Sequence, residues 1–107
     1  MGNYFVYVLT NPAQSVLYVG MTNHLERRLT EHYQQRGLPK TFAGRYYCYH
    51  LLYYERLPSA LQAISREKEI KKWNRKKKNE LIATMNPAWK MLNADIMPWP
   101  PHPDTAT

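Results

Sequence analysis

The spacing of apolar residues divides the first half of the chain into strand-like and helix-like segments. Residues 4–9 (YFVYVL) are rich in β-branched and aromatic side chains and stop at an Asn-Pro turn signal, which predicts a strand. Residues 15–19 have a similar composition and stop at Gly20, so the two segments together predict an antiparallel hairpin. Aromatic and aliphatic residues also dominate residues 46–55, where we expect a third strand.

A different spacing follows the hairpin and predicts the first helix. Asn23, with a glutamate three residues later, is the expected N-cap, and the helix should end before Gly37. Positions three and four apart share one face of this helix, which carries Leu25, Arg28, Leu29 and His32. We expect residues 39–44 to form a loop that leads to the third strand.

Two further helices are predicted in the second half of the chain. Ser59 and Gln62 form a capping box, and the helix that begins there should run to about Asn74. A second helical segment covers roughly residues 76–84 and ends before an Asn-Pro pair, because the residue before a proline disfavours helical backbone. The segment 97–103 is rich in proline and predicts an extended, mobile tail.

These elements occur in the order ββαβαα and predict an α+β fold. We expect a small three-stranded antiparallel sheet that is flanked by helices. A chain of 107 residues with 44% hydrophobic residues has room for one core. We therefore expect a single domain at residues 1–95 and a Pro-rich, flexible tail at residues 96–107.

Basic residues are both numerous and concentrated. The formal net charge is +7 and the pI is near 9.6, which favours a polyanionic partner, either nucleic acid or an anionic membrane surface. An ordinary soluble protein that happens to be basic is the alternative. Eight of the fifteen basic residues fall within thirteen positions: Arg66, Lys68, Lys71, Lys72, Arg75, Lys76, Lys77 and Lys78. Such a cluster favours binding to phosphates, so we predict that these residues contact nucleic acid.

Several other classes of protein receive no support from the sequence. The apolar runs are too short to span a bilayer and the N-terminus lacks a secretory signal, so we expect a cytoplasmic protein without a membrane partner. The lone Cys48 agrees with a reducing compartment. The four histidines are scattered and do not form a zinc-ligand pattern. Neither a glycine-rich phosphate loop nor a Gly-x-Ser-x-Gly nucleophile motif occurs.

Glu67 is the first candidate for chemistry. Three apolar residues, Ala63, Ile64 and Ile70, lie three or four positions away on its predicted helix, so its side chain should share their core-side face. A carboxylate in that position is costly unless something compensates its charge. Two interpretations are open: an ion pair with a neighbouring strand, or a functional carboxylate at the rim of a cleft.

Four residues on the earlier elements are further candidates. Arg28 and His32 lie one helical turn apart and should project toward an edge of the sheet, although Arg28 is equally compatible with an ordinary ion pair on the helix surface. Tyr7 and Tyr18 each lie on a predicted strand. Tyrosines in strands are usually core residues with the hydroxyl at the surface, and such a hydroxyl can also bind water or phosphate.

Five short motifs occur in order along the chain. They are Phe5-Val6-Tyr7, then after ten residues Tyr18-Val19-Gly20, then Arg28 and His32 on the next helix, and Arg66-Glu67 on a later one. With these motifs the chain resembles the GIY-YIG nuclease superfamily over about residues 4–93. It looks closest to the short stand-alone bacterial members, and more distant from the N-terminal domain of the bacterial excision-repair nuclease and from phage homing endonucleases.

The resemblance implies a role for each matched residue. Tyr7 and Tyr18 match the two motif tyrosines, one of which helps to activate the attacking water. Arg28 matches the arginine that stabilises the charged phosphate, and His32 falls near the scissile group. Glu67 matches the single carboxylate that holds one Mg²⁺ or Mn²⁺ ion.

Three further positions are predicted to support the site. Gly20 closes the second motif, and either Asn86 or Asn93 corresponds to the late asparagine of the family. Phe5 stands where the first motif has glycine, a departure that is common in the stand-alone group. A tyrosine hydroxyl is a poor base unless its pKa is lowered, for which a metal or Arg28 is the expected cause.

The implied function is that of a divalent-metal-dependent endonuclease that hydrolyses DNA phosphodiester bonds in repair or recombination. A metal and a fixed cation offset the charge that develops on the phosphate, and one carboxylate can hold Mg²⁺ because this ion keeps several waters. RNA stays open as a substrate. Two alternatives are an inactive nucleic-acid-binding module of the same fold and an adapter whose Pro-rich tail binds a protein partner. The sequence makes no prediction of oligomeric state.

Overall fold

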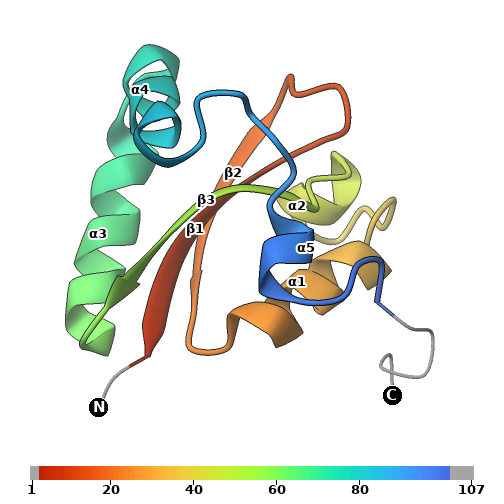
Figure 1. Ribbon diagram of the computed structural model, residues 1–107, viewed down its shortest axis with the longest axis horizontal. Coiled ribbons are helices and arrows are strands. Elements are labelled where there is room, and N and C mark those ends of the chain that lie inside the picture. Colours follow the sequence, from red (N-terminus) through yellow and green to blue (C-terminus); the bar gives the residue numbers. More distant parts are fainter. Residues whose placement is uncertain (1–2, 102–107) are drawn as a thin grey trace.

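Three antiparallel strands form the centre of the computed structural model, which describes residues 3–101 (Figure 1). They are β1 (Tyr4–Thr10), β2 (Leu17–Thr22) and β3 (His50–Leu57), in the order β2-β1-β3. The three predicted strands and the hairpin of the first two are confirmed. The third strand begins later than predicted because Tyr47 has a φ of 59°, in the left-handed region, which interrupts extended backbone.

The three predicted helices are present, together with two single-turn helices that were not predicted. The predicted ones are α1 (Leu25–Gln34), α3 (Ala60–Lys72) and α4 (Arg75–Met85). The additional ones are α2 (Phe42–Arg45) and α5 (Asn93–Ile96). Helix α2 replaces part of the loop expected at residues 39–44, because the Thr41 side chain accepts a hydrogen bond from the backbone N–H of Gly44 and caps the turn.

Helix caps explain where the three longer helices begin. The predicted cap at Ser59 is confirmed, since its hydroxyl accepts a hydrogen bond from the backbone N–H three residues on. Asn74, expected as the end of this helix, instead caps α4 in the same way. The cap predicted at Asn23 is wrong: α1 is capped by the next residue, His24, whose Nδ1 accepts the N–H of Arg27 at 3.1 Å.

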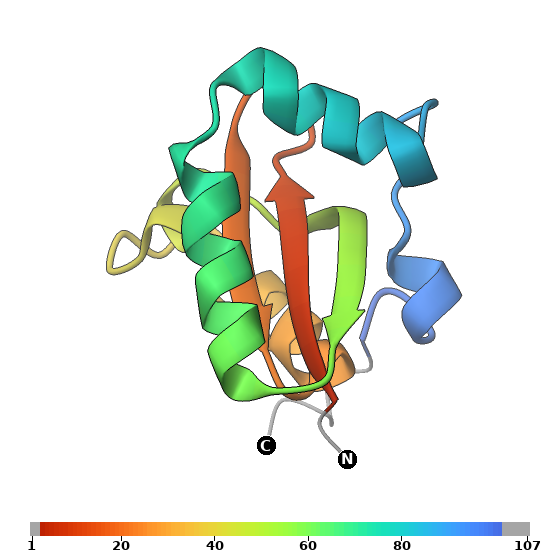
Figure 2. The ribbon, with the colours of Figure 1, turned by 90° about the vertical axis from the view of Figure 1, so that its left-hand side faces the viewer.

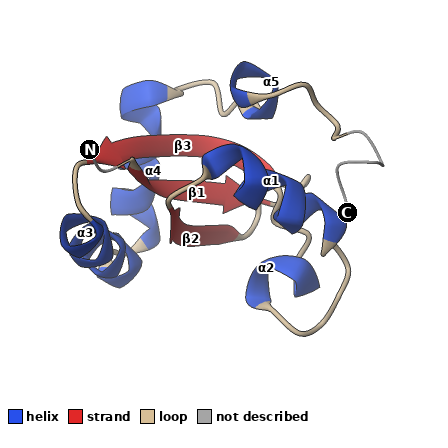
Figure 3. Ribbon diagram, turned by 90° about the horizontal axis from the view of Figure 1, so that it is seen from below, coloured by secondary structure: helices blue, strands red, loops and turns tan. Residues whose placement is uncertain are grey.

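Helices cover both faces of the sheet (Figures 1 and 3). On one face, here called the α3 face, α3 runs along the sheet and α4 crosses its upper end (Figure 2). Its core contains Val6, Val8, Val19, Leu52, Tyr53, Ala63, Ile70 and Ile82. On the opposite face, the α1 face, α1, α2 and α5 cover Tyr7, Leu9, Leu25, Leu29, Ala43, Cys48 and Leu51. Successive residues of β1 therefore alternate between two cores, and the predicted α+β fold is confirmed.

A β-bulge changes the alternation of side chains in β3. Val8 pairs with Tyr53 and Leu9 with Leu51, so Leu52 is an extra residue between two ladder positions. As a result, Leu52 and Tyr53 both contribute to the core of the α3 face, while Leu51 contributes to the core of the α1 face.

The first part of the predicted tail packs against the domain. Met97 and Trp99 contact the core of the α1 face, and the ring centroid of Trp99 lies 5.2 Å from that of Tyr33. Residues 97–101 thus lie against the domain, while residues 102–107 of the predicted tail lie outside the part of the chain that the structure describes, and the flexibility of the tail stays a prediction. Between residues 3 and 101, no helix combines the length and the apolar character that crossing a bilayer requires.

Candidate active site

Tyr7 and Gly20 face each other across β1 and β2 and define the space of the site. Tyr7 is fully buried in the middle of β1, and its register partner in β2 is Gly20. A Cβ atom added at Gly20 would lie 2.6 Å from the hydroxyl oxygen of Tyr7 and 2.9 Å from Cε2 of Tyr18. Both rings therefore occupy the place that a side chain at residue 20 would need, which explains the glycine at this position.

His32 of α1 completes a cluster of three rings. Its Nε2 lies 2.8 Å from the hydroxyl oxygen of Tyr7, within hydrogen-bond distance. The His32 ring centroid is 5.7 Å from that of Tyr7 and 5.4 Å from that of Tyr18, and the two tyrosine centroids are 6.3 Å apart. Three predicted site residues, which come from β1, β2 and α1, thus lie together beside Gly20.

Burial keeps both partners of this hydrogen bond neutral at neutral pH. It lowers the pKa of His32 to about 3, and the charge of Arg28 lowers this pKa further. Burial also raises the pKa of Tyr7 well above its usual value, and Tyr18 adds to the increase. Arg28 acts in the opposite direction on the pKa of Tyr7, but the effect of burial is larger. Arg28 alone therefore does not turn Tyr7 into a base, contrary to one of the two expected causes.

Arg28 links the ring cluster to the surface. Its guanidinium is close enough to Tyr7 to affect the pKa of the hydroxyl, and 30% of its side chain is exposed. Its Nη1 also donates a hydrogen bond of 3.0 Å to Oε1 of Glu31, an ion pair within α1. The ion pair on the helix surface is therefore present, and a role of Arg28 toward phosphate stays a prediction. A guanidinium has five N–H donors, so the contact with Glu31 leaves others for a phosphate.

Glu67 approaches the tyrosines from α3. Helix α3 packs against β1 and β2, the charge of Glu67 makes the smallest contribution to the pKa shift of Tyr7, and 18% of the Glu67 side chain is exposed. Its ion-pair partner is Lys71, one turn further along α3, with Nζ 3.3 Å from Oε2. An ion pair with a strand is made by the preceding residue instead, since Arg66 binds Glu55 of β3 at 2.7 Å. For Glu67 itself that interpretation is wrong.

The surroundings of Glu67 suit a hydrated divalent cation. Within residues 3–101, no group of three or more His, Cys, Asp or Glu side chains gathers at one point. A single, partly exposed carboxylate fits Mg²⁺ or Mn²⁺, because these ions accept oxygen ligands and Mg²⁺ keeps several waters. Lys71 is no obstacle, since half of its side chain is exposed and it can turn away from Oε2.

The eight basic residues predicted to contact nucleic acid do not form one uniform patch. Four of them interact within the chain: Arg66, Lys71, Arg75 and Lys77. Arg66 is held most strongly, because Glu55 and Glu69 bind it at 2.7 and 2.8 Å. Among the others, Lys68, Lys72 and Lys76 are exposed, and Lys78 is half-buried. Contact with nucleic acid through this segment stays a prediction, for which the lysines are better suited than Arg66.

Asn86 and Asn93 bind the backbone of β3 and of the residue before it. Asn93 accepts a hydrogen bond from the N–H of Leu51 and donates one to the carbonyl of Tyr49, each 2.8 Å long. Asn86 donates to the carbonyl of Leu52, the extra residue of the bulge. Both asparagines thus act on the edge of the sheet opposite β2, and support of the active site by either of them stays a prediction.

Phe42 of α2 adjoins the ring cluster, Tyr46 at the C-cap of α2 adjoins Phe42, and neither was predicted as a site residue. The ring of Phe42 stacks on Tyr18, with centroids 6.4 Å apart and an angle of 23° between the planes. Tyr46 follows, with its centroid 4.8 Å from that of Phe42. They were missed because a loop was expected at residues 39–44 and a strand from Tyr46 onward. The spacing of four between two aromatic residues, just after the capping Thr41, is a signal of a helical turn.

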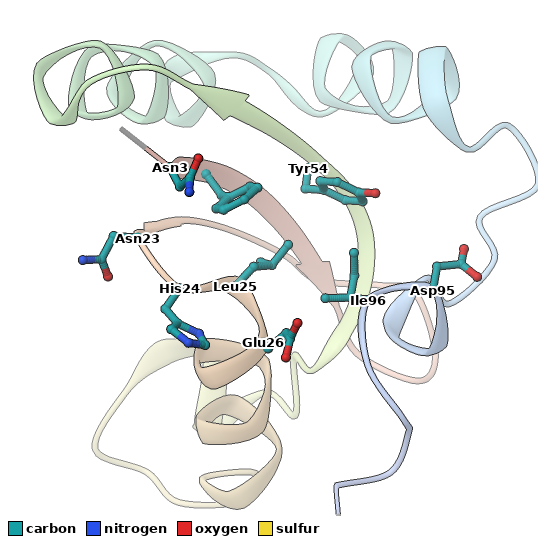
Figure 4. A pocket seen from close by; sticks show the side chains of 9 residues that line it. Asn3, Asn23, His24, Leu25, Glu26, Tyr54, Asp95 and Ile96 are labelled. Atoms are coloured by element: carbon teal, nitrogen blue, oxygen red, sulfur yellow. The ribbon is translucent and has the colours of Figure 1, made fainter. Parts of the chain in front are cut away.

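A separate hollow lies beside the start of α1 (Figure 4). Its volume is about 360 Å³, and its lining includes Asn3, Phe5, Asn23, His24, Leu25, Glu26, Tyr54, Asp95 and Ile96. The lining is apolar at Phe5, Leu25 and Ile96 and acidic at Glu26 and Asp95. Two carboxylates repel phosphate, so this hollow is a poor site for a nucleic-acid backbone.

The fold and the ring cluster together define a GIY-YIG catalytic domain, and the chain belongs to this family. The family model, described as the GIY-YIG catalytic domain, matches residues 3–80. Tyr7, Tyr18, Arg28, His32 and Glu67 all lie within the match. The predicted resemblance is therefore confirmed.

The relatives of the chain carry the name UPF0213. A UPF0213 protein from Bacillus pumilus is 37% identical over 83 residues, which are 78% of this chain and 82% of the relative. One from Natronomonas pharaonis is 41% identical over 81 residues, 76% of this chain and 92% of the relative. The solution NMR structure of a UPF0213 protein from Bacillus halodurans is similar with a TM-score of 0.52 and 29% identity, over 86% of this chain and 93% of that one.

Proposed function

We propose that the protein is a divalent-metal-dependent endonuclease that hydrolyses phosphodiester bonds in DNA. The observation that carries this proposal is the convergence of a Tyr–His hydrogen bond, a partly exposed arginine and a partly exposed carboxylate near one hydroxyl group. Membership of a nuclease family supports the reaction class. The resemblance to the excision-repair nuclease favours a setting in DNA repair or recombination.

Arg28 and Glu67 supply opposite charges to the reaction. When bound at Glu67, Mg²⁺ or Mn²⁺ would neutralise phosphate oxygens and stabilise the leaving oxygen. Arg28 binds a non-bridging phosphate oxygen with the donors that Glu31 does not use, and its positive charge cannot be lost at physiological pH. Stabilisation of this kind is often the largest single contribution to phosphoryl chemistry, since charge accumulates on these oxygens in the transition state.

The Tyr7–His32 hydrogen bond offers a path for the proton of the attacking water. As the water oxygen bonds to phosphorus, its proton moves to the hydroxyl oxygen of Tyr7, and the proton of Tyr7 moves to Nε2 of His32, 2.8 Å away. This path requires the His32 tautomer with its proton on Nδ1. It avoids a free phenolate, which the raised pKa of Tyr7 disfavours. The low pKa of His32 leaves Nε2 unprotonated in the resting protein and makes it a weak base, so it holds the proton only during the attack.

Exposed lysines of α3 and α4 are suited to hold the backbone of the substrate. Lys68 and Lys72 lie on α3, the helix that carries Glu67, and Lys76 lies at the start of α4. Because Arg66 is engaged with two glutamates, we assign the grip mainly to lysine. Neutralising about 4 phosphates of duplex DNA would give a log–log salt slope of about −3.6.

The test compares wild type with Glu67→Gln on labelled duplex, single-stranded and branched DNA, with Mg²⁺, Mn²⁺ or EDTA. We expect metal-dependent cleavage that falls about 10³-fold in Glu67→Gln, because the variant loses the negative charge that holds the cation. Binding to duplex should persist. Glu69→Gln is the matched control, since Glu69 lies two residues further on the same helix and pairs with Arg66 instead.

Two results would contradict the proposal. Cleavage that continues in EDTA or survives in Glu67→Gln would remove the role of the metal. No cleavage of any substrate, with salt-sensitive binding intact in both proteins, would favour a nucleic-acid-binding module of the same fold.

A further inference from the structure

Helix α2 exposes two aromatic side chains next to the ring cluster. Phe42 is 51% exposed and Tyr46 is 42% exposed, although large aromatic residues are usually more buried. Leu38 and Tyr47, in the flanking turns, are half-exposed as well. Exposed apolar residues that gather on one short segment indicate a binding surface more often than isolated ones do.

The aromatic pair continues the ring cluster toward solvent. Phe42 stacks on Tyr18 with an angle of 23° between the planes, and Tyr46 lies 4.8 Å beyond Phe42 between centroids. The row Tyr18–Phe42–Tyr46 thus begins at a residue that belongs to the proposed active site. Figure 3 shows α2 and α3 on opposite sides of the β2 edge, so a strand held by the lysines of α3 can pass beside α2.

The backbone beneath the pair is fixed, although the rings are exposed. Ala43 and Gly44 are buried between them, and the N–H of Gly37 donates a hydrogen bond of 2.8 Å to the carbonyl of Gly44. Tyr47 adopts a φ of 59°, which is rare for a bulky residue. Its ring packs closely on Gly37, since a Cβ atom added there would lie 2.8 Å from the Tyr47 hydroxyl oxygen. Strain that persists in an ordered surface segment is typical of ligand-binding positions.

The charge around the pair fits a polyanion. Lys40 and Arg45, both exposed, flank Phe42 along the chain, and α2 carries no acidic residue. Aromatic platforms with basic neighbours bind single strands, because every base has a flat face that can stack on a ring while the cations hold the backbone. In a duplex these faces are covered by neighbouring base pairs.

We propose that Phe42 and Tyr46 form a stacking subsite for an unpaired base beside the cleaved phosphodiester bond, so that the preferred DNA carries a single-stranded segment there. This inference rests on the proposed nuclease function and adds a class of substrate to it. A partner protein or a second copy of the chain would also cover apolar rings, but neither accounts for the continuity of the row with Tyr18.

The test measures binding with the cleavage-impaired Glu67→Gln protein, so that it does not depend on turnover. The probe is an oligodeoxynucleotide that contains 2-aminopurine, used as a single strand and as a duplex. Phe42→Leu and Tyr46→Leu should each weaken binding of the single strand roughly 10-fold and restore the quenched fluorescence, because leucine is apolar but cannot stack. Phe42→Trp should restore binding. Leu61→Ala, at an exposed apolar position of α3, is the control and should leave the binding of both the single strand and the duplex unchanged.

The outcomes separate this inference from the proposed function. Selective loss of single-strand binding supports the subsite. If the wild type cleaves none of the DNA offered, only the proposed nuclease function is contradicted. Equal losses on both substrates, or no loss with either leucine variant, would overturn the subsite. A wild-type dimer that becomes monomeric in Phe42→Leu by light scattering would also overturn it, because the rings would then cover each other. Tyr46→Leu controls for misfolding in Phe42→Leu, since it leaves the Phe42–Tyr18 stack in place.

Discussion

The two faces of the sheet differ in the groups that they bury, although the candidate site draws on both, because Glu67 lies on α3. The core of the α3 face is formed largely by aliphatic residues, among them Val6, Val8 and Ile70. The α1 face instead buries polar groups, above all Tyr7, His32 and Asn93. Strand β1 serves both faces, since its even residues point to one and Tyr7 and Leu9 to the other. A single alternating strand therefore carries an aliphatic core on one side and the ring cluster of the candidate site on the other.

The polar face is stable because its groups are paired. Among the described residues, every buried side-chain nitrogen or oxygen has a hydrogen-bond partner. Tyr7 and His32 satisfy each other, and Asn93 binds two backbone groups around β3. Burying such groups without partners would cost more than the fold could tolerate. The difference between the faces leads to predictions in which activity and stability respond separately.

Removing Arg28 should have the largest effect, and only on activity. Arg28→Ala should lower kcat about 10³-fold, because a fixed cation facing the phosphate is lost. The free energy of unfolding should change by less than about 0.5 kcal/mol, since the variant gives up a partly exposed ion pair. Single-turnover cleavage and urea unfolding measure the two quantities. Arg27→Ala, one residue earlier and more exposed, should leave both unchanged. If it lost as much activity, charge alone would explain the effect.

On the α3 face, Ile70→Ala should lower stability and leave activity nearly unchanged. Ile70 is fully buried, so its truncation should lower the free energy of unfolding by about 3 kcal/mol through lost burial and the cavity left behind. Cleavage per folded molecule should stay near wild type, measured well below the unfolding temperature. Ile64→Ala on the same helix should cost less than 1.5 kcal/mol by the same principle, as Ile64 is 38% exposed. The separation of the two faces would fail if Ile70→Ala lost activity while keeping its urea midpoint.

Gly20→Ala should lower both activity and stability, because residue 20 faces Tyr7 inside the candidate site. The added methyl group would meet the hydroxyl of Tyr7 at 2.6 Å and push it away from His32. A displacement of about 1 Å can cost about 100-fold in kcat, or about 2.7 kcal/mol in the barrier. Stability should fall as well, and Tyr7→Phe added to Gly20→Ala should recover part of it, as a double-mutant cycle in urea would measure. Full additivity of the two substitutions would contradict the proposed clash.

Acid should weaken the α1 face through His32. Its pKa is about 3 in the folded protein against the usual 6.5, so the unfolded chain binds more protons between these values. Stability is therefore complete above pH 6.5 and falls as the pH drops toward 3, by up to about 1.4 kcal/mol per pH unit for one group. Urea midpoints from pH 7 to pH 4 should show this slope, reduced in His32→Gln. Burial also lowers the pKa of His50, so a smaller slope of the same sign should remain. An unchanged slope in His32→Gln would show that other groups cause it.

The main elements could be predicted because their signals are local. Residues 4–9 and the capping box at Ser59 show their structure in a few neighbouring positions, and both predictions are confirmed. The proposed catalytic residues were identified from the order of the family motifs, whereas the spacing of each residue alone left its role open. Position along a helix was less reliable: Ile64 shares a predicted face with Glu67 but is partly exposed.

The features that were missed depend on contacts between distant segments. The ion pair of Arg66 with Glu55 requires that α3 pass close to β3, which no local pattern shows. The same holds for Asn93, whose partners lie more than forty residues earlier.

The contacts of residues 86–93 with β3 determine where this domain can be truncated. The family match ends at residue 80, yet Leu92 donates its backbone N–H to Leu51, and the amides of Asn86 and Asn93 bind the same strand. Without these contacts the outer edge of β3 would be open to pairing with other chains. A fusion protein that borrows this module for targeted cleavage should therefore keep the chain through Trp99, and attach its partner after residue 101.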